Sequence, residues 1–428
     1  MNDTLLEIVR RQKAGEAVGI TSVCSAHPLV LRAGVAQAVA DGTTALIEAT
    51  SNQVDQFGGY TGLVPAQFRD LVHGLADQVG LPRDRVVLGG DHLGPNTWRG
   101  LPAETAMSRA EELVVAYVEA GYDKIHLDCS MACEDDPPEL ADDVVAARSV
   151  QLARVAERAA GRRGDGPVPM YVIGTEVPVP GGAHHAITAL QPTSAAAARA
   201  TLAAHREAFD VAGLDDAWAR VMALVVQPGV EFDSTRVVDY DRTSTVELRT
   251  VLDDAPHTVF EAHSTDYQTV ERLTALVADH WAVLKVGPGL TFALREALFA
   301  LAAIENELVT GPRRSRLPEV VEQTMVADPH WWDGYYPGDA ETQRLARRYS
   351  YSDRLRYYWP DDRIVAAVDV LFANLDQIEI PLPLLSAFLP KQYARVREGV
   401  LLATARDLAV DHVRDVLRDY ARACSPSQ

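Results

Sequence analysis

Cysteine is scarce in this chain, and its scarcity excludes one class of protein. Only four cysteines are spread over 428 residues, and no two of them have the Cys-x-x-Cys spacing of a structural zinc motif. Small secreted domains depend on several disulfides, whereas proteins of the reducing cytoplasm leave their thiols free. We therefore expect no disulfide framework, no structural zinc site, and a cytoplasmic protein.

Positive charge and long apolar runs are also in short supply. The chain has 40 Lys and Arg against 60 Asp and Glu, which gives a formal net charge of −20. Such a surface repels a phosphate backbone, so we expect no general nucleic-acid role, and any phosphorylated ligand needs a local site. No stretch approaches the roughly 20 apolar residues of a membrane span, and the first residues lack the apolar core of a signal peptide. We expect no membrane association and no export.

Short apolar runs rich in β-forming residues alternate with longer helical patterns from residue 19 to residue 300. This alternation is typical of repeated βα units on a parallel sheet, and eight units favour a closed (β/α)₈ barrel over an open, doubly wound sheet. The expected strands are 19–25, 45–50, 85–90, 124–129, 170–175, 221–226, 258–262 and 282–286.

The pattern changes after Asn306, where strand-like runs become scarce and nine Trp and Tyr residues fall between positions 331 and 359. We expect a barrel over residues 1–305 and a helical C-terminal extension, residues 306–428, packed on it. The aromatic side chains are expected to pack this extension onto the barrel, or onto another copy in a homo-oligomer, in preference to stacking on a ligand.

The reacting groups of (β/α)₈ enzymes lie at the C-terminal ends of the strands, so polar residues that end an apolar run are candidates. The third expected strand ends in Asp91 and His92. Adjacent residues of an extended chain point in opposite directions, but a turn between them would let His92 hold a metal while Asp91 faces a substrate. Because an Asp-His pair is also common in loops, its position alone leaves open whether the pair is functional or an ordinary loop sequence.

The fifth and seventh strands add Glu176 and His263 at the same end of the barrel. With His92 they form a set of imidazole and carboxylate groups that suits a divalent catalytic ion such as Zn²⁺, which keeps one position open for substrate. The alternative is structural: His263 would bond a neighbouring strand, and Glu176 would pair with a basic residue.

Further polar residues at this end are expected to contact the ligand. Asp128 closes the fourth strand and is expected to line the site, whereas His126, two residues earlier on the same face, is expected to pack in the core. The remaining candidates are Glu48, Asn52 and Ser264. The glycine-rich loop 51–62 is either a cover that closes over the substrate or an ordinary connection.

The segment after the eighth strand is a candidate phosphate site. Lys285, Gly287 and Gly289 precede a helix, and glycines there let backbone N–H groups approach an anion. The last two βα loops of such barrels commonly hold phosphate, so position supports a signal that is weak by itself.

Long motifs connect these candidates. They are SVCSAHPLV at 22–30, IEATSNQVDQFGGYTG at 47–62, GGDHLGPN at 89–96, KIHLD at 124–128, YVIGTEVPVPGG at 171–182, VVQPGVEFD at 225–233, EAHSTDYQT at 261–269, LKVGPGLTFALREA at 284–297 and RYYWP at 356–360. Through these motifs the chain resembles, along nearly its whole length, the family of tagatose-bisphosphate aldolase non-catalytic (accessory) subunits, which reaches to related ketohexose 4-epimerases.

The resemblance implies roles for particular residues. The class II aldolases that this family resembles use an aspartate as acid/base and a following histidine on zinc, which are matched here by Asp91 and His92, with His263 as the last metal histidine. Where those aldolases carry a further metal histidine, this chain has Glu176, with His184 and His185 later in the same loop. Glu176 is therefore expected as a replacement ligand or catalytic carboxylate, and the departure favours an epimerase over an aldolase.

The resulting expectation is a metal-dependent 4-epimerase that interconverts tagatose 6-phosphate and fructose 6-phosphate by retro-aldol and aldol steps. The sequence leaves open whether the sugar is free, a monophosphate or a bisphosphate. The alternative is a non-catalytic subunit that stabilises the catalytic subunit of a class II tagatose-1,6-bisphosphate aldolase.

Overall fold

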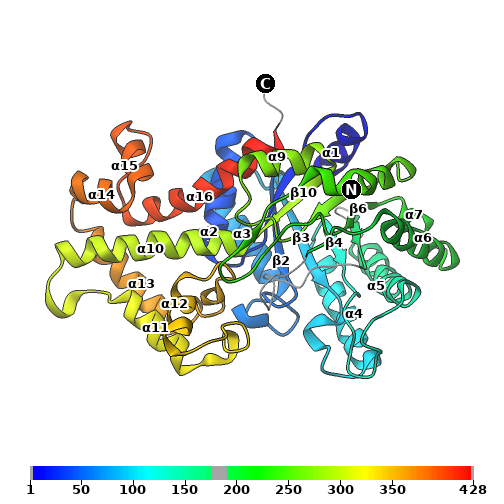
Figure 1. Cartoon of the computed structure of the whole chain (residues 1–428), viewed down its shortest axis with the longest axis horizontal. Helices are drawn as coiled ribbons and strands as arrows, with labels where there is room; N and C mark the ends of the chain where they lie inside the picture. The colour runs from blue at the N-terminus through cyan, green and yellow to red at the C-terminus, as the bar shows by residue number, and fades with distance from the viewer. Residues whose placement is uncertain (1–2, 165, 167, 176–189, 426–428) are drawn as a thin grey trace.

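Eight parallel strands close into a barrel in the computed structural model, which describes residues 3–164, 166, 168–175 and 190–425. The strand order around the barrel is β1-β10-β9-β6-β5-β4-β3-β2, and every neighbouring pair is parallel (Figure 1). All eight expected strands are present, which confirms the (β/α)₈ barrel. Their bounds are β1 Ile20–Val23, β2 Ala45–Thr50, β3 Val86–Leu93, β4 Lys124–Leu127, β5 Met170–Ile173, β6 Val221–Val225, β9 Val259–Ala262 and β10 Trp281–Val286.

Helices between the strands form the outer layer, and local sequence signals set their ends. Ser194 accepts a hydrogen bond from the N–H of Ala197 at the start of one helix, and Gly42 and Gly80 take left-handed conformations at the ends of two others. The main helices of this layer are α2 Pro28–Asp41, α3 Pro65–Val79, α4 Ala103–Glu119, α5 Asp142–Arg163, α6 Ala195–Val211, α9 Val270–Ala278 and α10 Pro288–Leu308. The short helix α7 Asp215–Trp218 lies between α6 and β6. Between β6 and β9 lie the antiparallel pair β7 Glu231–Phe232 and β8 Val237–Val238, and α8 Val246–Arg249.

The barrel interior is layered because side chains alternate between the two faces of a strand. Residues near the beginnings of the strands form an apolar cluster, into which helix α1, Asp3–Lys13, packs Leu5, Ile8 and Val9. Glu48, Glu261 and Lys285 each lie two positions beyond a residue of this cluster, and together with Lys124 at the start of β4 they put buried charged side chains where apolar ones would be expected. The apolar layer and α1 therefore close one end of the barrel, and the polar chemistry lies toward the other.

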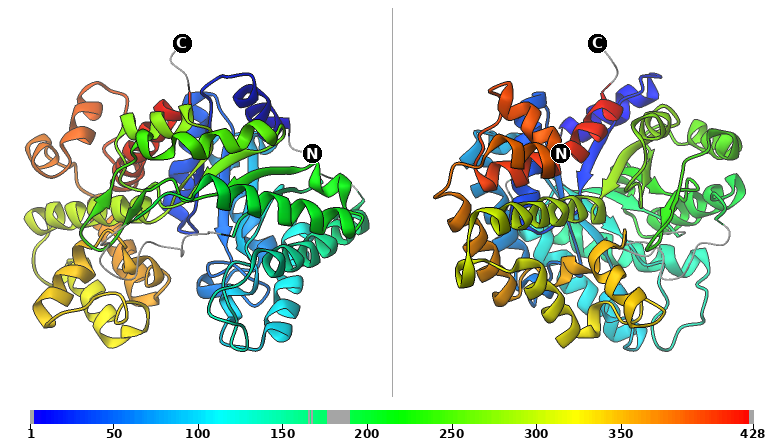
Figure 2. Two further views of the ribbon diagram at one scale, coloured as in Figure 1. Left: turned by 45° about the vertical axis from the view of Figure 1, so that its right-hand side comes forward. Right: turned by 60° about the vertical axis from the view of Figure 1, so that its left-hand side comes forward.

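The chain continues beyond the barrel in helices that lie beside it, on the side where α10 leaves (Figures 1 and 2). These helices are α11 Leu317–Ala327, α12 Ala340–Tyr349, α13 Asp362–Leu375, α14 Leu382–Phe388, α15 Pro390–Arg397 and α16 Ala405–Cys424. The expected division between residues 305 and 306 falls inside α10, so one continuous helix joins the two parts. The final helix α16 returns to the barrel, where Gly19 N donates to Cys424 O at 2.9 Å and Tyr420 donates to Thr265 O at 2.8 Å.

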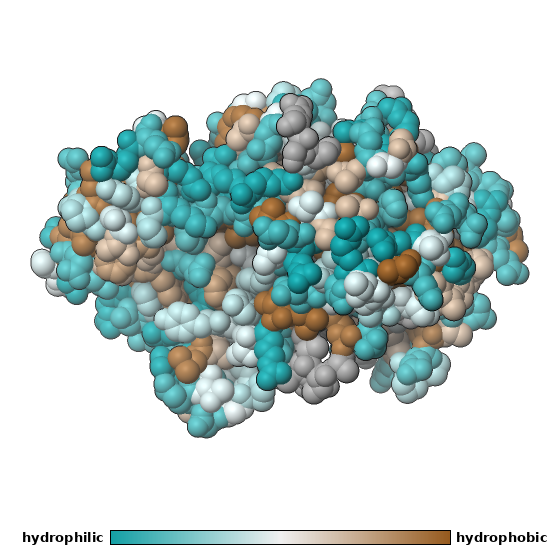
Figure 3. Space-filling model, turned by 45° about the horizontal axis from the view of Figure 1, so that its top comes forward, coloured by the Kyte–Doolittle hydropathy of each residue, from teal (hydrophilic) through white to brown (hydrophobic). Residues whose placement is uncertain are grey.

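The outer surface is polar over the face shown in Figure 3, where hydrophobic residues form small, separate patches. Among the described helices, none combines the length and the apolar character needed to cross a membrane.

Candidate functional site

A cavity of about 500 Å³ opens at the C-terminal end of the barrel strands. Its wall combines strand ends with residues of the C-terminal extension, so both parts of the chain shape one site. The lining residues used below are Cys24, His27, Asn52, Tyr60, Asp91, His92, His263, Ser264, Asp266, Lys285, Gly287, Arg356, Tyr357, Trp359 and Arg406.

Beneath this cavity lies the charged layer, which we define as Glu48, Lys124, Glu261 and Lys285. Lys124 Nζ lies 2.8 Å from Glu48 Oε1 and 2.7 Å from Glu261 Oε2, and Lys285 Nζ lies 3.1 Å from Glu261 Oε1. A Cβ atom at Gly89 would approach the Glu48 side chain to 2.6 Å, so glycine is needed there. The layer is a buried set of alternating charges, in which each ion pair offsets part of the cost of removing its members from water.

Asp91 and His92 both turn toward the cavity because the backbone changes direction between them. His92 has a φ of 51°, in the left-handed region, and the β3–β4 register shifts at this point. Asp91 Oδ1 lies 2.9 Å from His126 Nδ1 and forms an ion pair with Lys285. The turn that would let both side chains face the site is therefore present, and it places a carboxylate beside an imidazole.

Burial raises the pKa of Asp91, but the charges of His92 and Lys285 outweigh burial and hold that pKa well below its usual range. Asp91 is consequently a carboxylate that faces the cavity. Such a group can accept a proton from a hydroxyl held against it.

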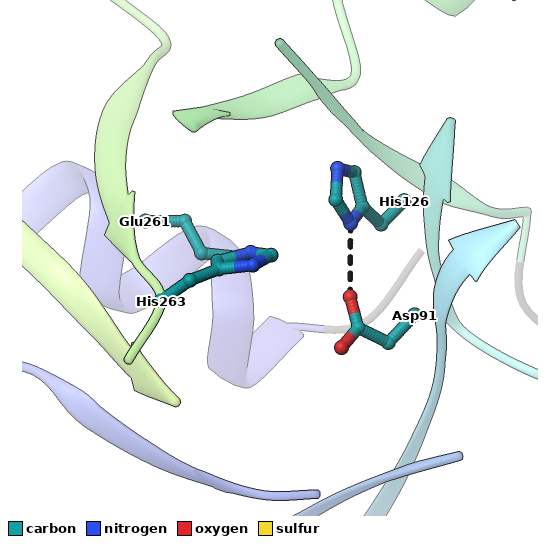
Figure 4. A group of neighbouring side chains, drawn as sticks. All are labelled: Asp91, His126, Glu261 and His263. Atoms are coloured by element: carbon teal, nitrogen blue, oxygen red, sulfur yellow. Dashed lines mark hydrogen bonds and ion pairs between the residues drawn. The ribbon is translucent and has the colours of Figure 1, made fainter. Parts of the chain in front are cut away.

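Three imidazoles, of His92, His126 and His263, form what we call the imidazole triangle. Their ring centres are 4.9 Å apart for His92 and His263, 5.2 Å for His92 and His126, and 5.3 Å for His126 and His263. Rings that share one metal at a distance of about 2.1 Å from nitrogen place their centres about 5 Å apart. Figure 4 shows His263 and Glu261 reaching from β9 toward Asp91 and His126 on the facing strands.

Two observations indicate that these residues fit a divalent cation. Asp91, His126, Glu261 and His263 offer ligand atoms that all lie within 4.8 Å of one another, and the buried Nε2 of His126 has no hydrogen-bond partner among the described residues. The buried carboxyl groups of Asp91, Glu48, Glu261 and Asp128 outnumber the two buried lysines of this region, Lys124 and Lys285. A divalent cation would balance an excess of negative charge, which buried sites otherwise strongly disfavour.

Asp128 does not line the cavity, contrary to expectation. Its Oδ2 lies 2.6 Å from His92 Nδ1, and its Oδ1 accepts from the Ser130 hydroxyl at 2.6 Å. The bond to His92 fixes the direction of the opposite nitrogen, Nε2, as a carboxylate behind a metal-binding histidine commonly does. Burial lowers the pKa of His92, but the Asp91 charge and the Asp128 carboxylate more than offset it and raise that pKa.

The structure separates the other expected ligand-contacting residues into two groups. Asn52, Ser264 and Lys285 line the cavity, whereas Glu48 is 0% exposed beneath it and belongs to the charged layer. Glu176, His184 and His185 lie outside the described residues, so the expected role of Glu176 stays a prediction.

The expected phosphate loop also needs correction. The N–H groups of Gly287 and Gly289 both donate to Asp266 Oδ1, at 2.9 Å and 2.7 Å. Gly287 lines the cavity and Gly289 does not appear in its wall. A phosphate was expected at the start of α10, whereas the structure places a carboxylate of the protein itself on these two N–H groups.

Several residues of the site were not expected from the sequence. The alternation of side chains along a strand would have identified two of them, His126 and Glu261. His126 was expected to be a core residue, yet it alternates with Lys124 and Asp128 on one face of β4 and therefore points inward with them. Glu261 likewise lies two positions before His263, so both side chains point to the same face and contact each other.

Residues of the C-terminal extension reach the site because the extension packs against the barrel. No local sequence pattern predicts this contact. Tyr357 and Trp359 line the cavity, although a packing role was expected for them. Tyr60, in the glycine-rich loop, lies 4.7 Å from Tyr357 between ring centres, while Asp55 Oδ1 accepts from the N–H groups of Phe57 and Gly59. The loop is thus held by its own hydrogen bonds and by contact with the extension.

Comparison with a family model gives a match over residues 5–425 to the description "D-tagatose-1,6-bisphosphate aldolase subunit GatZ/KbaZ-like". Among solved structures, the chain is similar to one described as a probable tagatose 6 phosphate kinase from Sinorhizobium meliloti 1021, with a TM-score of 0.87 and 49% identity. That match covers 95% of this chain and 100% of the other.

More distant matches carry no argument about function. The fructose-bisphosphate aldolase of Campylobacter jejuni has 14% identity and a TM-score of 0.41, over 88% of this chain and 94% of the other. The fructuronate-tagaturonate epimerase of Cohnella laeviribosi has 11% identity and a TM-score of 0.47, over 96% and 82%.

Proposed function

This chain belongs to the D-tagatose-1,6-bisphosphate aldolase subunit GatZ/KbaZ-like family, and we propose that it is itself an enzyme, a 4-epimerase of ketohexose phosphates. Its reaction would interconvert tagatose 6-phosphate and fructose 6-phosphate. The observation that carries the proposal is the ionised Asp91 at the cavity, in contact with Lys285 and beside the imidazole triangle.

The chemistry of the sugar decides which bond must break. C4 is not adjacent to the C2 carbonyl, so removal of its hydrogen as a proton gives no anion that the carbonyl can stabilise. Removal of the O4 proton instead lets the C3–C4 bond break, leaving an enediolate of the first three carbons and an aldehyde of the last three. Rotation of the aldehyde before the bond re-forms inverts C4.

Asp91 has the position and charge for the proton transfers in this scheme. Its carboxylate would accept the O4 proton as C3–C4 breaks and return it when the bond re-forms, the usual role of a general acid/base. The neighbouring Lys285 ammonium keeps Asp91 ionised before substrate arrives, and Glu261 holds that ammonium in place at 3.1 Å.

A divalent cation, with Zn²⁺ the expected ion, would be held by His92, His126 and His263 and, when bound, would act as a Lewis acid for charge developing on the substrate oxygens. Asp128 would orient His92 toward the ion through the 2.6 Å bond to Nδ1. Glu176 remains an expected further ligand.

The test is an assay of the purified chain alone with tagatose 6-phosphate and a divalent cation. Formation of fructose 6-phosphate without a partner protein, abolished by a chelator and by Asp91→Asn, supports the proposal. Full activity of either the metal-free protein or Asp91→Asn contradicts it.

The family description names an aldolase subunit. It supports a second candidate function, that of a non-catalytic subunit of a class II tagatose-1,6-bisphosphate aldolase. A purely stabilising subunit has no use for a buried carboxylate and imidazole cluster at a cavity. If the chain is inactive by itself and only raises the activity or lifetime of an added aldolase subunit, this second candidate replaces the first.

A further inference from the structure

Substrate phosphate needs a cation or free N–H groups, and the start of α10 offers neither. Asp266 Oδ1 already accepts from Gly287 N and Gly289 N, and Asp266 is 3% exposed. A phosphate at this point would meet the carboxylate that fills it. The phosphate-binding position common in barrels of this type is therefore closed here.

Three Lys and Arg side chains line the cavity among the described residues, and they differ in what already binds them. Lys285 is 4% exposed and surrounded by Asp91, Glu261 and Glu48. Arg406 is exposed at the start of α16 and lies over the Phe372 ring at 4.9 Å. Arg356 is partly buried, and no carboxylate of the described residues lies within 4.0 Å of it.

Neutral groups hold the Arg356 guanidinium in place. Its Nη1 donates to the backbone oxygens of Ser352 and Asp353, the latter at 3.2 Å, and its Nη2 donates to the Tyr357 hydroxyl at 3.2 Å. The guanidinium also lies over the Tyr357 ring, 4.6 Å from its centre. These contacts fix the side chain without neutralising its charge.

Asp353 and Asp266, two carboxyl groups near Arg356, are bound by other partners. Asp353 accepts from the Thr291 hydroxyl at 2.5 Å and lies 3.4 Å from Arg295 Nε. Asp266 is bound by the amides of α10. Among the described residues, Arg356 is thus a positioned cation at the cavity with no carboxylate within 4.0 Å, which is the arrangement that a phosphate monoester complements.

We propose that Arg356, with the Tyr357 hydroxyl, binds the phosphate group of the substrate, so that the C-terminal extension selects a phosphorylated sugar for the barrel. This inference rests on the proposed function and narrows it to sugar phosphates over free sugars. It also gives the extension a part in recognition beyond packing.

The test measures binding in place of turnover. D-glucitol 6-phosphate lacks a carbonyl and cannot undergo C3–C4 cleavage, and D-glucitol lacks the phosphate as well. Calorimetric titration of both into wild-type protein and into Arg356→Gln should show that the variant binds glucitol 6-phosphate on the order of 10- to 100-fold more weakly, the loss of one charge-assisted contact. Binding of glucitol should change less than threefold.

Two further variants serve as controls. Arg406→Gln removes the other cation of the upper wall and should alter glucitol 6-phosphate binding less than threefold. Arg356→Lys keeps the charge but not the fork of donors, and it should lose at least fivefold in the preference for glucitol 6-phosphate over glucitol while keeping the wild-type melting temperature, even if Arg356→Gln fails to fold.

Unchanged preference for the phosphorylated ligand in a folded Arg356 variant, or its loss in Arg406→Gln alone, overturns the inference. The outcome is separate from that of the proposed function. Phosphate-selective binding through Arg356 by a chain that interconverts no sugars would sink the epimerase and leave the phosphate site standing. If the chain interconverts tagatose 6-phosphate and fructose 6-phosphate, and Arg356→Gln has the wild-type KM, the epimerase stands and the phosphate site at Arg356 is overturned.

Discussion

The charged layer and the mouth of the cavity differ in how their charged side chains are paired. We define the mouth as Arg356, Tyr357 and Trp359. In the layer every ammonium meets carboxylates that come from other strands of the barrel, and the four residues are 0% to 4% exposed. At the mouth a guanidinium is held by backbone oxygens and a tyrosine, with no carboxylate of the described residues close by.

This difference indicates that proton transfer belongs to the barrel and phosphate binding to the mouth. Paired charges on strands are rigid and keep Asp91 ionised at a fixed place, as proton transfer requires. The Arg356 guanidinium, which no carboxylate of the described residues approaches within 4.0 Å, belongs to the C-terminal extension and is available to a ligand. Changes in the charged layer and its neighbours should therefore act on turnover, metal affinity and stability, and changes at the mouth on affinity for the phosphate.

The largest effect is expected for Asp91→Asn, which removes the proton acceptor while keeping the shape of the side chain. Loss of a general acid/base reduces kcat by about 10²- to 10⁴-fold. The exposed Asp333→Asn is the matched control and should keep wild-type kcat. Steady-state kinetics with tagatose 6-phosphate measures both, and equal kcat values for Asp91→Asn and wild type would remove Asp91 from the chemistry.

Lys124→Met tests whether the layer depends on its pairing. The change leaves Glu48 and Glu261 buried with only Lys285 to share, and breaking a buried pair costs about 3 to 5 kcal/mol of unfolding free energy. Lys391→Met, on the exposed side of α15, should cost far less. Denaturant unfolding compares them, and similar values for the two variants would show that the layer is not held by charge.

Asp128→Asn should weaken metal binding by about 10- to 100-fold, because it removes the carboxylate that orients His92. Ser130→Ala removes the other partner of Asp128 and should have a smaller effect. Titration of the chelator-treated variants with Zn²⁺ gives both affinities. Wild-type affinity in Asp128→Asn would mean that His92 is not a ligand.

A smaller, pH-dependent effect comes from His205, which lies on α6, remote from both regions. Burial lowers its pKa to about 4, below the unfolded value of 6.5, so its contribution to stability is present above pH 6.5 and is lost as pH falls toward 4. Between pH 6.5 and pH 5 the loss is about 2 kcal/mol. His205→Leu should lack this part of the pH dependence in denaturant titrations at the two pH values, and an unchanged pH dependence would contradict the assignment.

The barrel could be predicted from the sequence because its signals are local. Eight apolar runs, each followed by a helical pattern, are enough to specify the strands, and the period of two on β4 even contained the inward direction of His126. Depth in the barrel nonetheless favours a packed core role for His126, and only the contacts with Asp91 and with the N–H of His92 reveal its place in the site.

The rest depends on contacts between distant segments. Asp266 closes the α10 amides from 21 and 23 residues away, and Arg356 reaches the cavity only because helices after α10 fold back beside the barrel. Asp128 was expected at the substrate, and the structure directs it to His92, 36 positions earlier in the chain. No local pattern specifies such pairings.

The most direct test of the central claim, reversible C3–C4 cleavage at Asp91 by this chain alone, uses tagatose 6-phosphate carrying deuterium at C4. The purified chain with a divalent cation should form fructose 6-phosphate that keeps the deuterium at C4, because the C4–H bond never breaks, as mass and NMR spectra of the product would show. Loss of the deuterium to solvent, or no product until an aldolase subunit is added, would contradict the account.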